Sequence, residues 1–158
     1  MSDDSRPRLP GFRLFCTVAA VLYVLLGASM KLRGAHEAMR PFGVPKAVLD
    51  APHFDDFFQF LFLHMMVIGL LIGLLGWTVQ GARRQRAVAR VLCGLQLLYA
   101  TMDFRTSDSP LGNGLYQGKG SLVPPLMGVA MALVFAWLGT RRVAVEAVVP
   151  QRSRLRAD

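Results

Sequence analysis

The sequence has few charged residues and lacks the residue patterns on which common catalytic motifs are built. Charged residues make up 18% of the 158 residues, whereas a soluble domain carries about 25%. The two cysteines and three histidines form no CxxC pair, no zinc-ligand spacing and no secreted disulfide framework. The chain also has no P-loop, HExxH motif, GxSxG elbow or dinucleotide-binding GxGxxG turn. These absences argue against a soluble globular enzyme and against a metal site.

Long apolar stretches are what the sequence has instead. Hydrophobic residues make up 53% of the chain, and the mean hydropathy is +0.40. Asp, Glu, Lys and Arg are absent from residues 14–30, 57–82 and 120–140, and from the shorter stretch 91–102. A helix that crosses the hydrocarbon core of a bilayer needs about 20 apolar residues. The sequence therefore predicts an all-α fold in one membrane domain, residues 1–158, with four transmembrane helices at about 12–30, 57–79, 87–103 and 122–139.

The basic residues predict how these helices are oriented. The net charge is +8, but the basic side chains flank apolar segments, so no nucleic-acid partner is expected. Twelve Lys and Arg residues lie near the N-terminus, in the 80–90 loop and in the tail 140–158, against six in the loops 31–56 and 104–121. Cytoplasmic segments of membrane proteins carry the excess of Lys and Arg. Both termini are therefore expected in the cytoplasm, with Trp77 and Trp137 near that interface.

The two loops on the opposite side have different compositions. The first, residues 31–56, contains Pro41, Pro45 and Pro52 among apolar residues, and it is expected to form short helical or turn segments along the membrane surface. The second, residues 104–121, is rich in Gly, Ser and Asn and is expected to be irregular. Because irregular backbone near a membrane needs protein or water to cover it, the two loops are expected to form a lid.

Small residues recur on one face of several predicted helices. Gly69 and Gly73 form a GxxxG pair in the second helix, and Gly27 and Gly128 lie among other small residues in the first and fourth. Small residues let membrane helices approach closely, which is how such helices pack without a hydrophobic driving force. These glycines are therefore predicted to be helix-packing residues.

Polar residues in the third helix form one stripe. Gln96, Tyr99 and Asp103 follow an i, i+3, i+7 spacing, and Arg105 lies just beyond them. Polar groups in lipid are costly unless they are hydrogen-bonded, so such a stripe is a candidate ligand-binding or acid–base site. The structural alternative is that Gln96 and Tyr99 only join helices by hydrogen bonds, and that Asp103 and Arg105 form an interfacial ion pair.

Four polar residues of the second helix complete the candidate set. Asp55 and Gln59 fall towards the glycine face, His64 points away from it, and Asp56 lies between. Both carboxylates have a structural alternative, since acidic residues stabilise a helix N-terminus. His64 has three alternatives, which are an interhelical hydrogen bond, a ligand or proton-handling role, and ligation of a haem or chlorin. Haem is not favoured, because His36 and His53, the other two histidines, are loop residues.

Short motifs resemble a known family. Arg13 at the start of the first helix, GASMKL at 27–32 and FGVP at 42–45 resemble the DoxX-like group of small bacterial four-helix membrane proteins. The stretch from FGVP through VIGLLIGL, residues 42–74, is similar to the BphX-like branch. The resemblance covers about residues 12–102 and implies a bacterial inner-membrane bundle, with some relatives that accompany quinone-linked oxidation or aromatic degradation. Many members carry a Glu early in the second helix, where this chain has Gln59 and His64.

Three functions follow from these patterns. The leading one is a non-catalytic accessory subunit or lipophile-binding protein, with a quinone, lipid or pigment as ligand and a membrane protein or a second copy as partner. Its expected ligand-binding residues are Gln59, His64, Gln96, Tyr99, Asp103 and Arg105. The second is an intramembrane enzyme that transfers protons, for which Asp55, Asp56, His64, Tyr99 and Asp103 are the candidates. The third is an oligomeric transporter.

Overall fold

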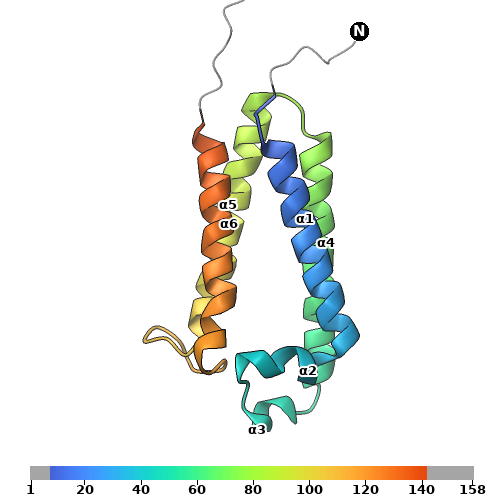
Figure 1. Ribbon diagram of the computed structural model, residues 1–158, viewed down its shortest axis with the longest axis vertical. Helices are drawn as coiled ribbons and strands as arrows, with labels where there is room; N and C mark the ends of the chain where they lie inside the picture. Colours follow the sequence, from blue (N-terminus) through green and yellow to red (C-terminus); the bar gives the residue numbers. More distant parts are fainter. Residues whose placement is uncertain (1–7, 142–158) are drawn as a thin grey trace, which may run out of the picture.

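The computed structural model describes residues 8–141, which form helices, turns and loops without a strand (Figure 1). Four helices dominate: α1 (Phe12–Arg33), α4 (Phe54–Thr78), α5 (Ala82–Thr106) and α6 (Val123–Thr140). Each of the four is long and apolar enough to cross a membrane. For α6 the span includes the preceding turn and runs from Gly120 to Thr140. The predicted fold class, an all-α bundle of four membrane-spanning helices, is therefore confirmed.

Short helices gather at one end of the molecule. They are α2 (Ala35–Met39), η2 (Arg40–Phe42), α3 (Lys46–Leu49) and η3 (Lys119–Leu122). This end, with the loop 107–118, is called the loop end. The opposite end carries residues 8–11, the turn 79–81 and residues 140–141, and is called the terminal end (Figure 1). The tail 142–158 and residues 1–7, to which part of the orientation argument refers, lie outside the described residues.

Helix α5 begins at Ala82, earlier than the start predicted near residue 87. The reason is Gln85, whose side chain accepts a hydrogen bond from the Leu9 amide over 2.7 Å and donates one to the Val79 carbonyl over 3.0 Å. These two bonds hold the first turn of α5 against residue 9 and against the turn that follows α4. The arginines expected in a loop at 80–90 therefore lie in the first turns of α5, and the connecting turn is short.

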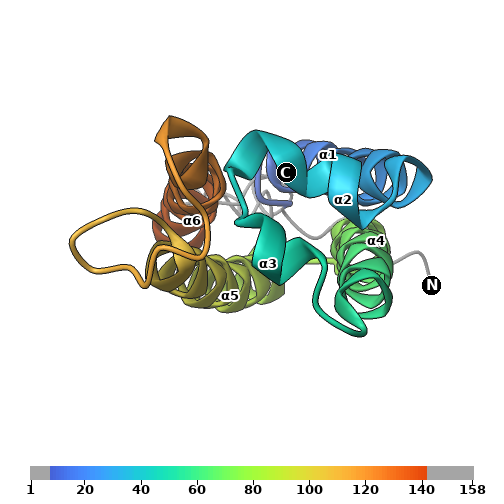
Figure 2. The same cartoon turned by 90° about the horizontal axis from the view of Figure 1, so that it is seen from below.

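The four long helices are arranged as two pairs. Helix α1 packs along α4, and α5 packs along α6, as the view from the loop end shows (Figure 2). Consecutive helices α4 and α5 belong to different pairs, although a short turn joins them. The bundle therefore consists of two tightly packed pairs with fewer contacts between them.

The glycines allow the close approach within each pair. A Cβ atom on Gly27 would lie 2.7 Å from the Phe62 carbonyl oxygen, and one on Gly69 would lie 2.9 Å from the Ala20 carbonyl oxygen. On the other pair, a Cβ on Gly128 would lie 3.0 Å from Cβ of Ala100. A side chain at any of these positions would push the paired backbones apart.

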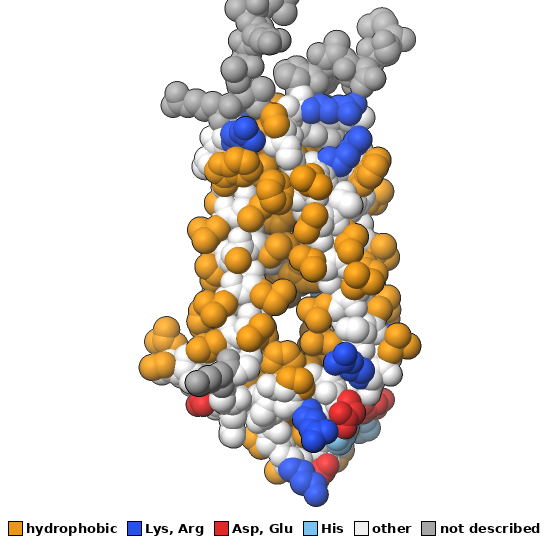
Figure 3. Space-filling model, viewed as in Figure 1, with side chains coloured by type: hydrophobic (Ala, Val, Ile, Leu, Met, Phe, Trp, Pro, Cys, Tyr) orange, Lys and Arg blue, Asp and Glu red, His pale blue; other side chains and the backbone are white. Residues whose placement is uncertain are grey.

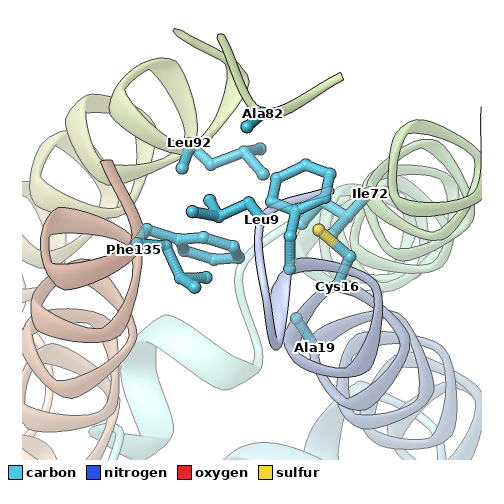
Figure 4. Packing of buried hydrophobic residues seen from close by; sticks show 10 residues of the cluster. Leu9, Cys16, Ala19, Ile72, Ala82, Leu92 and Phe135 are labelled. Carbon is cyan, nitrogen blue, oxygen red and sulfur yellow. The ribbon is translucent and has the colours of Figure 1, made fainter. Parts of the chain in front are cut away.

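The two pairs meet at both ends of the molecule. At the terminal end, buried side chains from all four helices form one apolar cluster (Figure 4). The cluster contains Leu9, Phe12, Cys16, Ala19, Ile72, Ala82, Ala89, Leu92, Phe135 and Leu138. At the loop end, the Gln117 amide donates to the Phe42 carbonyl over 2.8 Å, and the rings of Phe42 and Tyr116 lie 5.9 Å apart. The segment 34–53 and the loop 107–118 thus join the pairs at that end.

The outer surface is that of a multi-pass membrane protein. Apolar side chains cover the long helices, and charged side chains gather at the two ends (Figure 3). At the terminal end, the guanidinium of Arg13 lies 4.3 Å from the Trp77 ring centre, and that of Arg141 lies 4.8 Å from the Trp137 ring centre. Paired Trp and Arg side chains of this kind suit the headgroup region of a bilayer.

Candidate functional site

A cavity of about 350 Å³ lies between the two helix pairs. Its walls are mainly apolar side chains of α1, α4 and α6, including Leu22, Leu26, Leu61, Phe62, Ile68 and Met131. Met39, Phe42 and Tyr116 line it from the loop end. In the space-filling view the molecule is open between the pairs in its loop-end half (Figure 3). Small-molecule sites range from about 300 to 1,000 Å³, so the cavity has room for a small ligand.

Polar side chains from three of the four long helices and from the loop 107–118 meet in this apolar cavity. Tyr23 comes from α1, His64 from α4, and Gln96, Tyr99 and Asp103 from α5, while Tyr116 comes from the loop 107–118. An apolar wall with a few converging polar groups is the usual composition of a ligand-binding pocket. The stripe predicted on the third helix therefore faces the space between the pairs.

Gln96 is the most constrained of these side chains. It is fully buried, at 0% exposure, and its Oε1 accepts a hydrogen bond from the Tyr23 hydroxyl over 2.8 Å. Its Nε2 is buried without a hydrogen-bond partner, and no other buried N or O atom among the side chains that the structure describes is in this state. An unsatisfied buried donor costs about 1–3 kcal/mol. Gln96 thus carries an unused N–H donor at the wall of the cavity.

Tyr99 and Asp103 lie on the same face of α5 as Gln96, one and two helical turns nearer the loop end. Both side chains are partly buried, and both line the cavity. Asp103 has no ion-pair partner in the described part of the chain, and Arg105 is exposed and outside the cavity. The ion pair considered between these two residues is therefore not formed, because positions 103 and 105 point to different sides of the helix.

Tyr116 closes the cavity from the loop end. Burial raises the pKa of its hydroxyl, and the Asp103 carboxyl nearby raises that pKa further. The hydroxyl therefore keeps its proton at neutral pH and can donate a hydrogen bond. Its ring also rests against Phe42, so the tyrosine belongs to the contact that joins the loop 107–118 to η2.

His64 lies at the margin of the cavity. Its side chain is exposed and stacks on Phe60, with ring centres 6.3 Å apart and an interplanar angle of 25°. Within residues 8–141, no group of three or more His, Cys, Asp or Glu side chains is placed to hold a metal ion. His64 is thus positioned to touch a ligand that enters between the pairs.

The remaining predicted residues serve the loop end instead of the cavity. The Asp55 carboxylate accepts a hydrogen bond from the Ala35 amide over 3.2 Å at the start of α2. Asp56 lies 3.4 Å from Nδ1 of His53 on the surface, and Gln59 accepts a hydrogen bond from Lys31 over 3.3 Å. Asp55 and Gln59 therefore face α1 and α2, in keeping with their place on the glycine face of the helix.

Sequence reasoning did not assign Tyr23, Tyr116 or the methionines to the site. Five of the eight methionines line the cavity: Met30, Met39, Met65, Met127 and Met131. A tyrosine among small residues in mid-membrane was a usable signal for Tyr23, because its hydroxyl needs a partner there. Tyr116 and the methionines gave no such signal, since only the packing of distant segments brings them together. Methionine is flexible, so this wall can adapt to a ligand.

Comparison with protein-family models, with curated proteins and with solved structures finds no match to this chain.

Proposed function

We propose that the protein binds a lipophile in the cavity between its two helix pairs. In this role it would be a binding protein or an accessory subunit of a larger membrane complex. The observation that carries the proposal is the buried Nε2 of Gln96, which has no hydrogen-bond partner at the wall of an apolar cavity. A carbonyl or ether oxygen of a ligand would accept that hydrogen bond and offset the cost of the unsatisfied donor. Quinones, lipids and many pigments carry such an oxygen on an apolar body.

The proposal also covers the orientation of the protein in the membrane and the molecules that contact its outer surface. Basic side chains at the terminal end, among them Arg13 and Arg141 beside tryptophan rings, support a cytoplasmic location for that end. The cavity would then open into the outer half of a bacterial inner membrane. Exposed apolar side chains such as Leu25, Leu70 and Leu133 would contact lipid chains, a membrane-protein partner or a second copy. Membership in the DoxX-like group is part of this proposal, and the short motifs within residues 12–102 are its support.

The direct test is to extract the protein from its native membrane into copolymer nanodiscs, without detergent, and to identify bound lipophiles by mass spectrometry. We expect one lipophile to be enriched over the bulk membrane in the wild-type protein. Gln96→Leu should weaken the affinity for it about tenfold and so lower its occupancy, since one lost hydrogen bond of about 1.4 kcal/mol corresponds to that factor in the dissociation constant.

Thr101→Val is the matched control for this experiment. Thr101 is also a polar residue of α5, but its side chain is exposed and its hydroxyl donates to the Leu97 carbonyl of its own helix. The control should retain the lipophile. An equal lipophile content in the wild-type protein and Gln96→Leu, or no enrichment in either, contradicts the proposal.

A second candidate function is proton transfer to or from the bound lipophile. The observation that favours it is the presence of Tyr99, Asp103 and His64 on the walls of one cavity, where acid and base groups can reach the same molecule. In that case the wild-type protein would convert the lipophile identified above, and Asp103→Asn would bind it without conversion.

A further inference from the structure

We infer that the ligand of this cavity is a lipophilic ammonium compound, whose cationic head lies at Asp103 and whose hydrogen-bond acceptor lies deeper, at Gln96. The inference rests on the proposed function and adds the chemical class of the ligand.

The charge of Asp103 is the first support. This carboxylate lies on a membrane-spanning helix, lines the cavity and has no ion-pair partner among the residues that the structure describes. Of the described side chains, no Lys or Arg lines the cavity. Ionisable groups within the membrane are costly and normally pair with an opposite charge. A cation supplied by the ligand would meet this requirement.

The aromatic side chains near Asp103 are the second support. Tyr99, Tyr116 and Phe42 line the cavity together with this carboxylate, and the Phe42 and Tyr116 rings lie 5.9 Å apart. The faces of aromatic rings attract ammonium groups through the ring quadrupole, and the attraction is stronger where water is excluded. A carboxylate beside several aromatic rings is therefore better suited to an organic ammonium group than to a small hydrated metal cation.

The spacing along α5 fixes the shape of the ligand. Gln96 and Asp103 lie on one stripe about two helical turns apart, which corresponds to about 10 Å. The ammonium group and the oxygen that accepts from Gln96 must be separated by a similar distance. Around Gln96 the wall is formed by apolar side chains such as Ile68 and Met131, which suit the hydrocarbon part of the ligand.

Two synthetic probes that differ only in a terminal ammonium group test this inference. The decanoyl amide of hexamethylenediamine carries an ammonium group about 10 Å from its carbonyl, taking about 1.25 Å per extended bond from ordinary covalent geometry. The decanoyl amide of hexylamine is its neutral counterpart. Binding of both would be measured by native mass spectrometry and calorimetry on the full chain in nanodiscs of digalactosyldiacylglycerol, an uncharged lipid without an ammonium group, with empty nanodiscs as blank.

We expect the charged probe to bind about tenfold more tightly than the neutral one. Asp103→Asn should bring the charged probe to the affinity of the neutral probe and leave the neutral probe unchanged. Asp56→Asn is the matched control, since Asp56 is an exposed carboxylate at the loop end outside the cavity, and it should leave both affinities unchanged.

The outcomes separate the two proposals. If the two probes bind with equal affinity, and if Gln96→Leu lowers that affinity while Asp103→Asn leaves it unchanged, the ammonium inference is overturned and the lipophile site is supported. Failure of both probes to bind, or binding that Gln96→Leu leaves unchanged, would overturn both. Asp103→Asn and Gln96→Leu replace side chains with others of similar volume, and thermal unfolding in the same nanodiscs checks that each variant is folded.

Discussion

At the scale of single residues, the site depends on one buried amide. The sequence places Gln96, Tyr99 and Asp103 on one helical face, because a period of 3.6 residues fixes that geometry locally. It does not reveal that Tyr23 on α1 donates to Gln96 over 2.8 Å, since this contact joins residues 73 positions apart. The spare donor on Gln96 follows from that contact, because the tyrosine uses the oxygen of the amide and leaves the nitrogen without a partner.

A double-mutant cycle measures this contact. Tyr23→Phe and Gln96→Leu each remove one partner, and we expect a coupling energy of about 0.6–1.7 kcal/mol, the range measured for hydrogen bonds between membrane helices. Gln96→Leu also removes the unsatisfied Nε2 donor, which partly offsets the loss of the acceptor for the Tyr23 hydroxyl in the ligand-free protein. Reversible unfolding in lipid bicelles is the measurement. A coupling energy near zero would show that the two side chains do not interact.

At the scale of elements, the helices are readable from the sequence and their pairing is not. The uncharged stretches predict the four membrane-spanning helices. Pro124 and Pro125 lie in the first turn of α6, where a missing N–H donor breaks no hydrogen bond of the helix. Each pair consists of long helices that follow one another in the chain, yet α4 and α5, which the shortest connection joins, belong to different pairs. The glycine positions decide this pairing, because they permit backbone approach only where the opposing helix presents a small or flat surface.

The glycine contacts predict that two glycine-to-leucine substitutions change the stability of the protein differently. Gly27→Leu should destabilise the protein by about 1–3 kcal/mol, because a side chain there would collide with the Phe62 backbone. Gly94→Leu is the control: Gly94 is exposed on α5, and a Cβ there would meet nothing within 4 Å. We expect the control to be neutral or stabilising by up to about 1 kcal/mol, since glycine is a poor helix former. Equal destabilisation by both substitutions would argue against the α1–α4 pairing.

At the scale of the whole molecule, two tight pairs joined at both ends enclose the cavity. The apolar cluster holds the pairs together at the terminal end, and the Gln117–Phe42 hydrogen bond joins the loop 107–118 to η2 at the loop end. The sequence indicates which loops face the same side, from the even number of spans and from the basic residues. It does not indicate the cavity, which exists because two closely packed pairs leave unfilled space between them.

Cysteine labelling tests the proposed orientation. In a background with Cys16 and Cys93 replaced by alanine, Asn113→Cys at the loop end should react with a membrane-impermeant maleimide added to intact cells. Gln80→Cys in the terminal-end turn should react only after the membrane is opened. Both native residues are exposed, so accessibility alone does not distinguish them. The reverse pattern of labelling would place the cavity in the inner half of the bilayer and the termini outside.

Solid-state NMR in nanodiscs gives the most direct test of the ligand site at Gln96. The protein would carry isotope-labelled glutamine side-chain nitrogen, and the decanoyl amide of hexylamine would carry an isotope-labelled carbonyl carbon. We predict a dipolar contact over about 4 Å between the probe carbonyl and one glutamine nitrogen, the separation that one N–H···O=C hydrogen bond imposes. This contact should vanish in Gln96→Leu. A saturating amount of bound probe without a contact to any glutamine side chain would contradict a lipophile site between the helix pairs.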